Sequence, residues 1–317
     1  MRSFLSILLC LCCFAAHAWP TKPVRLVVAY PPGGGIDVMA RQIAEKLTPA
    51  WGQPVVVENK PGANTIVATD AVAKSPTDGH TILMTTDATF SINPHLYAKL
   101  PFDTQRDFIP VTMLVLLQQL LVAHPALPAN NLSELISLAK AKPGAINYAS
   151  YGSGSQPHLS GEMLKNKAGI DLVHVPYKGI SLAVPAVMAG EVQLTFAGIA
   201  TSMPQLKAGR IKAIAIGGAQ RSPLLPQVPT FSELGYPEVE THAWFGLFLP
   251  AGSPPEAISR IHRDAKKILE EPEFRQKQLI DKGYEVVGSS PDEFAAYIRK
   301  DSESRARAVK ISGAKAE

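Results

Sequence analysis

The amino-acid sequence predicts an α/β protein of two lobes joined by two crossing strands, and three observations support this fold class. Strand-like apolar runs alternate with helical patterns along most of the chain, which is typical of mostly parallel sheets covered by helices. Two of the strand-like runs end in a glycine-rich turn that leads into a helix. Two uncharged strand-like runs, at 109–123 and 244–249, are placed to carry the chain from one lobe to the other and back.

Residues 1–18 have the features of a secretory signal peptide. Arg2 precedes an apolar run, and the small-residue ending Ala-His-Ala predicts cleavage after Ala18. A membrane anchor is the rival interpretation, but the apolar run is shorter than the roughly 20 residues that span a bilayer. A lipoprotein is a weaker alternative, because no cysteine follows a Gly, Ala or Ser. We therefore expect an exported protein.

Residues 19–121 and 246–317 are predicted to form the first, discontinuous lobe. Helical spacing of apolar residues predicts its helices, and β-rich runs between turn residues predict its strands. In chain order these are a strand at 24–30, a helix at 38–47, a strand at 55–57, a helix at 63–74 and a strand at 81–84. Three polar-faced helices should pack back onto this lobe, at 255–269, 273–282 and 292–308.

Residues 122–245 are predicted to form the second lobe, inserted between the two crossings. The same patterns predict helices at 132–142, 158–167 and 182–189. They predict strands at 146–149, 172–175, 192–196 and 213–216. A continuous lobe inserted into a discontinuous one is the architecture of a clamp with two crossings, which we expect to close by a hinge motion.

The composition disfavours several classes of protein. The chain has 31 basic and 27 acidic side chains with no basic run, which argues against a nucleic-acid or polybasic membrane surface. All three cysteines lie within residues 1–18, so the remaining chain cannot form disulfides and depends on a large apolar core. The histidines are scattered singly, without metal-binding spacing, and we expect neither a metal nor a cofactor.

The two glycine-rich turns are the strongest functional signal. The first, Pro31-Pro32-Gly33-Gly34-Gly35, follows strand 24–30, and the second, Ser150-Tyr151-Gly152-Ser153-Gly154-Ser155, follows strand 146–149. Each would direct free backbone N–H groups and the positive end of a helix dipole beyond the end of its strand. Neither turn contains a lysine or arginine. We therefore expect one turn from each lobe to hold a small anion, such as a carboxylate, through main-chain N–H groups and hydroxyls.

Other interpretations of the turns fit less well. Ile36-Asp37 follows the glycines where a Walker loop needs Lys-Ser/Thr, and the spacing of a dinucleotide fingerprint is absent. A turn that uses glycine only for its positive φ remains the structural alternative. A hydrolase with Ser153 or Ser155 as its nucleophile is a second alternative, although the G-x-S-x-G spacing of a nucleophile elbow is missing.

Residues in and beside these turns, and in two further turns at 85–88 and 176–179, are the candidate ligand contacts. Asp37 is included, although capping of the following helix is its alternative role. Taken singly, the aromatic residues near the turns and the return crossing fit the core better than a site, but together they could line a pocket between the lobes. They are Tyr30, Phe90, Tyr151, Tyr177, Trp244 and Phe245. The candidates are Tyr30, Pro32, Gly33, Gly34, Gly35, Asp37, Thr86, Asp87, Ser150, Tyr151, Gly152, Ser153, Ser155 and Tyr177.

Many ordered motifs of the chain resemble the tripartite tricarboxylate transporter substrate-binding receptors, also called Bug proteins. They include the segments 22–28, 32–35, 52–63, 93–97, 173–179 and 244–246. The resemblance implies a type II periplasmic binding protein fold, whose lobes close on a small carboxylate and pass it to a membrane permease. It further implies a periplasmic, non-enzymatic and monomeric receptor. A receptor that presents its ligand to a signalling partner is the alternative.

Three departures from the family pattern fall in loops expected to face the ligand. Ile36 stands where the family usually has Thr or Ser, and Asn64-Thr65 replaces a glycine pair. Ala197-Gly198 stands where many members have Asp-Asn, which removes an acidic group and suits a ligand without an amino group. The resemblance thus adds Ile36, Ala197 and Gly198 to the candidate contacts. The ligands of relatives should not be transferred to this chain.

Overall fold

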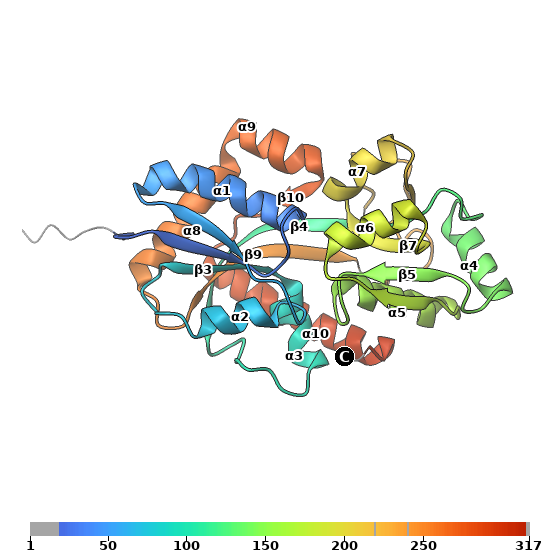
Figure 1. Cartoon of the computed structure of the whole chain (residues 1–317), viewed down its shortest axis with the longest axis horizontal. Coiled ribbons are helices and arrows are strands. Elements are labelled where there is room, and N and C mark those ends of the chain that lie inside the picture. Colours follow the sequence, from blue (N-terminus) through green and yellow to red (C-terminus); the bar gives the residue numbers. More distant parts are fainter. Residues whose placement is uncertain (1–18, 219, 240, 315–317) are drawn as a thin grey trace, which may run out of the picture.

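The computed structural model describes residues 19–218, 220–239 and 241–314, so the predicted signal peptide lies outside the described residues. A mixed sheet of ten strands runs through the molecule, with the strand order β2-β1-β3-β9-β4-β7-β5-β6. β10 and β8 pair with β4 outside this path. Figure 1 shows the strands as two groups, each with helices around it, and we call these groups the first and the second lobe.

The first lobe is built from parallel strand–helix units. β1 pairs in parallel with both β2 and β3, because each connection between them is a helix. The first segment of this lobe contains β1 (Val24–Val28), α1 (Gly35–Trp51), β2 (Val55–Asn59), α2 (Ile66–Ala73), β3 (Thr81–Thr86), the short π-helix η1 (Ala88–Ile92) and α3 (Asn93–Leu96). The last segment of the chain adds β9 (His242–Pro250), α8 (Pro255–Glu270), α9 (Pro272–Phe274), η2 (Arg275–Leu279), η3 (Ile280–Lys282), β10 (Tyr284–Val286) and α10 (Pro291–Ser312).

The second lobe has its own parallel strands. β5 pairs in parallel with β6 and with β7. Its elements are α4 (Leu132–Ala141), β5 (Asn147–Ser150), α5 (Gln156–Ala168), β6 (Val173–Pro176), α6 (Ile180–Ala189), β7 (Leu194–Gly198), α7 (Ile199–Lys207) and β8 (Lys212–Ile216).

The long strand β4 (Phe108–Ala123) connects the two lobes. Its residues 108–118 pair antiparallel with β9, whereas residues 119–123 pair antiparallel with β7 of the second lobe. β4 therefore changes partners between Gln118 and Gln119. The crossing predicted at 109–123 is thus a strand, as expected, while the lobe boundaries at 121/122 and 245/246 stay a prediction.

Apolar clusters cover both faces of the sheet in each lobe, as parallel strands require. In the first lobe, α1 and α8 bury Ile43 and Ile261 on one face, and α2 and α10 bury Val72 and Phe294 on the other. In the second lobe, α4 and α5 cover one face, and α6 covers the other. Within the described chain, none of the helices has both the length and the apolar character that a membrane span would require.

The structure contains elements that the patterns did not predict. α7, β10 and the turn formed by η1 and α3 are short, so none of them carries a long periodic signal. α2 begins at Ile66 and not at 63, because residues 63–65 adopt positive φ angles that no helix accommodates. α10 packs on the first lobe as expected, but its Val309 also contacts Leu159 of α5 in the second lobe.

Candidate ligand-binding site

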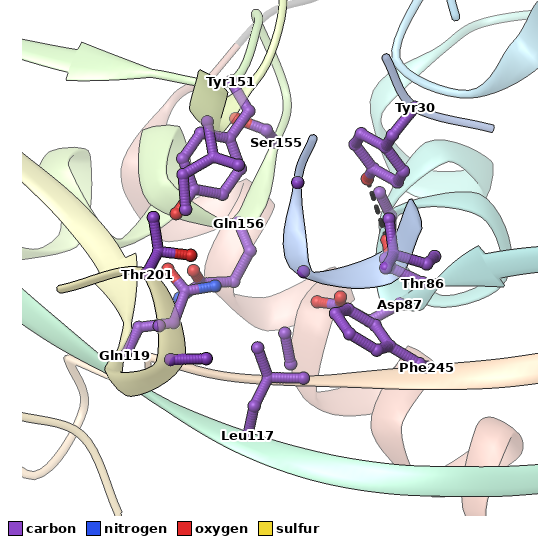
Figure 2. Close-up of a pocket in the computed structure, with 18 of the residues that line it drawn as sticks. Tyr30, Thr86, Asp87, Leu117, Gln119, Tyr151, Ser155, Gln156, Thr201 and Phe245 are labelled. Carbon is purple, nitrogen blue, oxygen red and sulfur yellow. Dashed lines mark hydrogen bonds between the residues drawn. The ribbon is translucent and has the colours of Figure 1, made fainter. Parts of the chain in front are cut away.

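A cavity of about 80 Å³ lies between the two lobes, and both contribute to its wall (Figure 2). The first lobe contributes the loop between β1 and α1, the end of β3, and parts of β4, β9 and β10. The second lobe contributes the ends of β5 and β7 and the starts of α5, α6 and α7. The predicted residues that line the cavity are Tyr30, Gly34, Gly35, Ile36, Thr86, Asp87, Tyr151, Ser155 and Gly198.

Four helices begin at this cavity. α1 starts after Gly34, α5 after Ser155, α6 after Gly179 and α7 after Gly198, and the first residues of each helix line the wall. None of these four helices has an N-cap side chain that accepts a hydrogen bond from its first turn. First-turn N–H groups are free of intrahelical partners, and helix dipoles place positive potential there. The convergence makes the cavity an environment that favours negative charge.

The ionisable side chains on the wall carry no positive charge. Among the described residues that line the cavity, none is a lysine, arginine or histidine, and Asp87 is the acidic one. Burial raises the pKa of the Tyr30, Tyr151 and Tyr284 phenols above the usual value, so they are neutral. The Tyr30 hydroxyl bonds Thr86 Oγ1 at 2.9 Å.

Asp87 is almost completely buried and belongs to a charged cluster beneath the cavity. Its Oδ2 lies 3.5 Å from Arg305 Nη2, and Arg305 also pairs with Asp301 at 3.3 Å. Desolvation raises the pKa of Asp87 to about 6, in spite of the attraction of Arg305. For Asp301, Arg305 and several hydrogen-bond donors outweigh desolvation and hold its pKa well below the usual value. The cluster thus has two carboxyl groups for one guanidinium.

Asp37 holds the first glycine turn in place. Its carboxylate accepts hydrogen bonds from Gly33 N–H at 2.9 Å and from Asn59 Nδ2 at 2.9 Å, and it pairs with Arg41 at 3.0 Å. Although desolvation opposes it, these contacts lower the pKa of Asp37. Gly33 itself has a φ of 86°, which favours glycine. Asp37 therefore fastens the turn to α1 from outside the cavity.

The second glycine turn is held by hydroxyls and by two histidines. The hydroxyls of Ser150 and Ser155 both donate to Gly152 O, at 3.0 and 2.7 Å. Gly154 N–H donates to His158 Nδ1 at 2.9 Å, and the His158 ring stacks on His174 at 3.9 Å. Desolvation and the nearby His174 lower the pKa of His158 to about 3, so it accepts this bond as a neutral imidazole.

Several predicted residues shape the turns but do not line the cavity. Two of them, Asp37 and Ser150, hold the glycine turns in place through the hydrogen bonds described above. As ligand contacts they stay predictions: Pro32, Gly33, Asp37, Ser150, Gly152, Ser153, Tyr177 and Ala197.

The hydrolase alternative gains no geometric support. The Ser155 hydroxyl donates to a backbone carbonyl, and Ser153 Oγ has no hydrogen-bond partner among the described residues. Ser150 does contact His174 Nε2 at 2.7 Å, but Ser150 is 0% exposed and cannot meet a substrate. No group of three or more His, Cys, Asp or Glu side chains in the described chain is placed to hold a metal ion.

About half of the residues that line the cavity were not identified from the sequence. For one of these residues a signal was present, because Gln119 interrupts an otherwise apolar strand. Tyr284 comes from a strand that reaches the cavity only through tertiary pairing. Phe245, one of the aromatic residues considered as a possible pocket wall, does line the cavity. The missed residues are Pro31, Ala88, Leu117, Gln119, Gln156, Ile180, Ser181, Ala200, Thr201, Ala243 and Tyr284.

The lobes touch each other around the cavity. A Cβ built on Gly34 would lie 3.4 Å from Ile180 of the second lobe, and one built on Gly179 would lie 3.3 Å from Pro31 of the first. Gly154 of the second turn lies so close to Leu96 of α3 that a Cβ would overlap with it. The structure therefore shows the two lobes closed on each other.

Comparison with known proteins agrees with the sequence resemblance. Residues 39–313 match the family described as the tripartite tricarboxylate transporter family receptor. The structure of R. palustris Rpa4515 with adipate is 33% identical, has a TM-score of 0.90 and covers 94% of this chain and 99% of that one. The structure of the periplasmic binding protein BugD is 32% identical, with a TM-score of 0.88 and coverage of 94% and 99%. That of MatC from Rhodopseudomonas palustris with bound malate is 30% identical, with a TM-score of 0.86 and coverage of 93% and 100%.

These findings confirm the predicted fold class and the family resemblance. The α/β lobes, the strand β4 that crosses between them and the likeness to BugD are those of a periplasmic binding protein. The family match spans more than half of the chain. This chain belongs to the tripartite tricarboxylate transporter receptor family, the Bug-type solute receptors.

Proposed function

We propose that the protein binds the carboxylate of a small metabolite between its lobes, through backbone N–H groups and without a cationic side chain. The observation that supports this best is the convergence of α1, α5, α6 and α7 on a wall whose described residues include no lysine, arginine or histidine. Each helix N-terminus stabilises a nearby anion by about 0.3–1 kcal/mol, and by more when partly buried. Hydrogen bonds from N–H groups to a carboxylate are roughly twice as strong as neutral ones.

The relatives support the same class of ligand. Rpa4515 was solved with adipate and MatC with malate, and both compounds are carboxylates. The small size of the cavity is consistent with a small ligand.

The wider role follows from the family. The protein reaches the periplasm by means of the signal peptide predicted at 1–18, acts there as a monomer without catalysis, and delivers its ligand to permease subunits of a tripartite tricarboxylate-type transporter. BugD, a periplasmic binding protein of the same fold, supports this assignment. A pull-down from membranes with the ligand-loaded receptor as bait should recover the permease subunits.

A ligand screen tests the proposal. The protein is unfolded and refolded to remove bound compounds, and its melting temperature is measured with C4 to C6 mono- and dicarboxylates at millimolar concentration. At least one acid should raise the melting temperature by mass action, whereas the matching alcohols and amines should not. A screen in which no carboxylate raises it would contradict the proposal.

A variant that carries its own carboxylate tests the role of the helix N-termini. Ala200 is the second residue of α7 and lines the cavity. Ala200→Asp should satisfy the first-turn N–H groups and weaken carboxylate binding by about tenfold or more, while the unliganded protein stays as stable as before. Ala200→Asn is the control of equal size, and it should weaken binding much less. Equal losses of carboxylate affinity in Ala200→Asp and Ala200→Asn, measured by calorimetry, would show that the added side chain acts only by steric hindrance.

A further inference from the structure

Gln119 is a polar side chain on the cavity wall, and the proposed binding of a carboxylate by helix N-termini does not involve it. It lies on β4 at the point where this strand passes from the first lobe to the second, and it is 3% exposed. Figure 2 shows Gln119 on the same side of the cavity as Thr201 and Gln156, with Asp87 and Phe245 on the opposite side.

The backbone of Gln119 is fixed on both sides. Its N–H donates to Thr241 O at 3.0 Å, and its carbonyl accepts from Gly217 N–H and from Thr241 Oγ1, each at 2.9 Å. Gly217 is packed so closely against Thr241 that a Cβ would overlap with it. The amide of Gln119 is therefore presented to the cavity from a rigid support, which is what selective recognition requires.

The amide oxygen is the part of Gln119 that needs a ligand. Among the described residues, no donor forms a hydrogen bond with Gln119 Oε1, although this atom is buried. A buried acceptor without a donor is costly, and the cost is removed when a bound molecule supplies the donor. An amide also has a donor in its Nε2 group, so it pairs best with a group that both donates and accepts.

We propose that Gln119 selects the second functional group of the ligand, and that this group is a hydroxyl or a primary amide and not a second carboxylate. This inference rests on the proposed function, in which the helix N-termini hold the first carboxylate. An ionised carboxylate only accepts hydrogen bonds, so it would leave Oε1 without a donor and face it with a negative oxygen.

Four probes of equal length test the selection. Calorimetric titrations with hexanoate, 6-hydroxyhexanoate, adipate monoamide and adipate differ only in the group at the far end. The hydroxyl or the amide compound should bind about tenfold to hundredfold more tightly than both hexanoate and adipate. A parallel series of C4 compounds, namely butanoate, 4-hydroxybutanoate, succinamate and succinate, covers a shorter ligand.

Two leucine variants on neighbouring positions separate recognition from packing. Gln119→Leu should abolish the preference for the hydroxyl and amide compounds over the unsubstituted acid in each series. Hexanoate should bind at least as well as to the wild type, which also shows that the variant is folded. Gln118→Leu is the control, because Gln118 does not line the cavity and its Nε2 donates to Gln220 O at 2.9 Å outside it. Gln118→Leu should bind the hydroxyl or the amide compound more tightly than the unsubstituted acid and the dicarboxylate, as the wild type does.

The possible failures are distinguishable. Tightest binding of adipate or succinate by the wild type, or a preference that survives Gln119→Leu, would overturn the assignment of Gln119 and leave carboxylate binding intact. No binding of any compound of either series by the wild type would overturn this inference, and together with a negative screen of the other acids it would contradict the proposed function.

Discussion

Asp87 shows how one residue gains its properties from distant parts of the chain. It follows β3, whereas its partner Arg305 and the competing carboxylate Asp301 come from α10 near the other end of the sequence. His242 of β9 and the phenols of Tyr30 and Tyr151 are further ionisable groups that interact with Asp87. Burial is the dominant influence, and it favours the neutral acid.

The raised pKa of Asp87 predicts a pH dependence of stability. The shift from 3.8 to about 6 corresponds to about 3 kcal/mol. Between these two pH values the folded state binds more protons than the unfolded state, so the contribution of this group to stability decreases as pH rises and reaches its lowest value above pH 6. Asp87→Asn should remove this decrease.

Denaturant titrations of both proteins from pH 4 to pH 8 measure the effect. The free energy of unfolding of the wild type, relative to that of Asp87→Asn, should fall as pH rises from 4 to about 6 and should level off above pH 6. A difference that is constant with pH would show that Asp87 is ionised throughout this range.

Among the elements, α10 connects the site to the rest of the molecule. It carries Asp301 and Arg305 beneath the cavity, and it packs on both lobes (Figure 1). Its start is defined by a capping box, in which Ser290 Oγ accepts from Glu293 N–H at 3.3 Å and Glu293 Oε2 accepts from Ser290 N–H at 2.8 Å. The sequence motif Ser-x-x-Glu thus positions a helix whose functional residues lie further along it.

Loss of this cap should destabilise the whole protein. Ser290→Ala is expected to lower the free energy of unfolding by about 1 kcal/mol, because one first-turn N–H group loses its acceptor. Ser290→Asp is the control, because its carboxylate can accept the same hydrogen bond. Its free energy of unfolding should fall much less than that of Ser290→Ala. Chemical denaturation measures both variants. Equal stability of Ser290→Ala and wild type would mean that the helix start is held by tertiary packing alone.

For the molecule as a whole, Gly154 lies at the contact between the two lobes, and we expect lobe closure to require glycine there. This residue has a φ of 79° and lies against Leu96 of the other lobe, whereas Gly169 has a φ of 61° with open space around it. Gly154→Ala should keep the lobes apart and weaken carboxylate binding by about tenfold or more. Gly169→Ala is the matched control, since it introduces the same backbone strain without the contact.

Both alanine variants should lose about 1 kcal/mol of stability, but only Gly154→Ala should lose affinity. Calorimetry gives the affinities, and small-angle scattering shows whether the ligand still makes the protein more compact. Equal affinity of the two variants would show that the contact between Gly154 and Leu96 is not needed for closure.

The local features of this protein follow from short stretches of its sequence. Alternating strand and helix patterns, the two glycine turns and the break at Gln118 and Gln119 are all visible within short windows, because backbone conformation follows from neighbouring residues. For the same reason the starts of α1 and α5 at the two turns were predictable.

Which side chains share the cavity depends on how distant segments of the chain pack together. Gln119, Tyr284 and Phe245 reach it because β4, β9 and β10 pair across long separations in the chain, and no local pattern encodes such pairing. The same holds for Asp87 and Arg305, whose charges act on each other only when both are buried together. Local sequence sets the ends of strands and helices, whereas burial, pairing and desolvation arise only when distant segments pack.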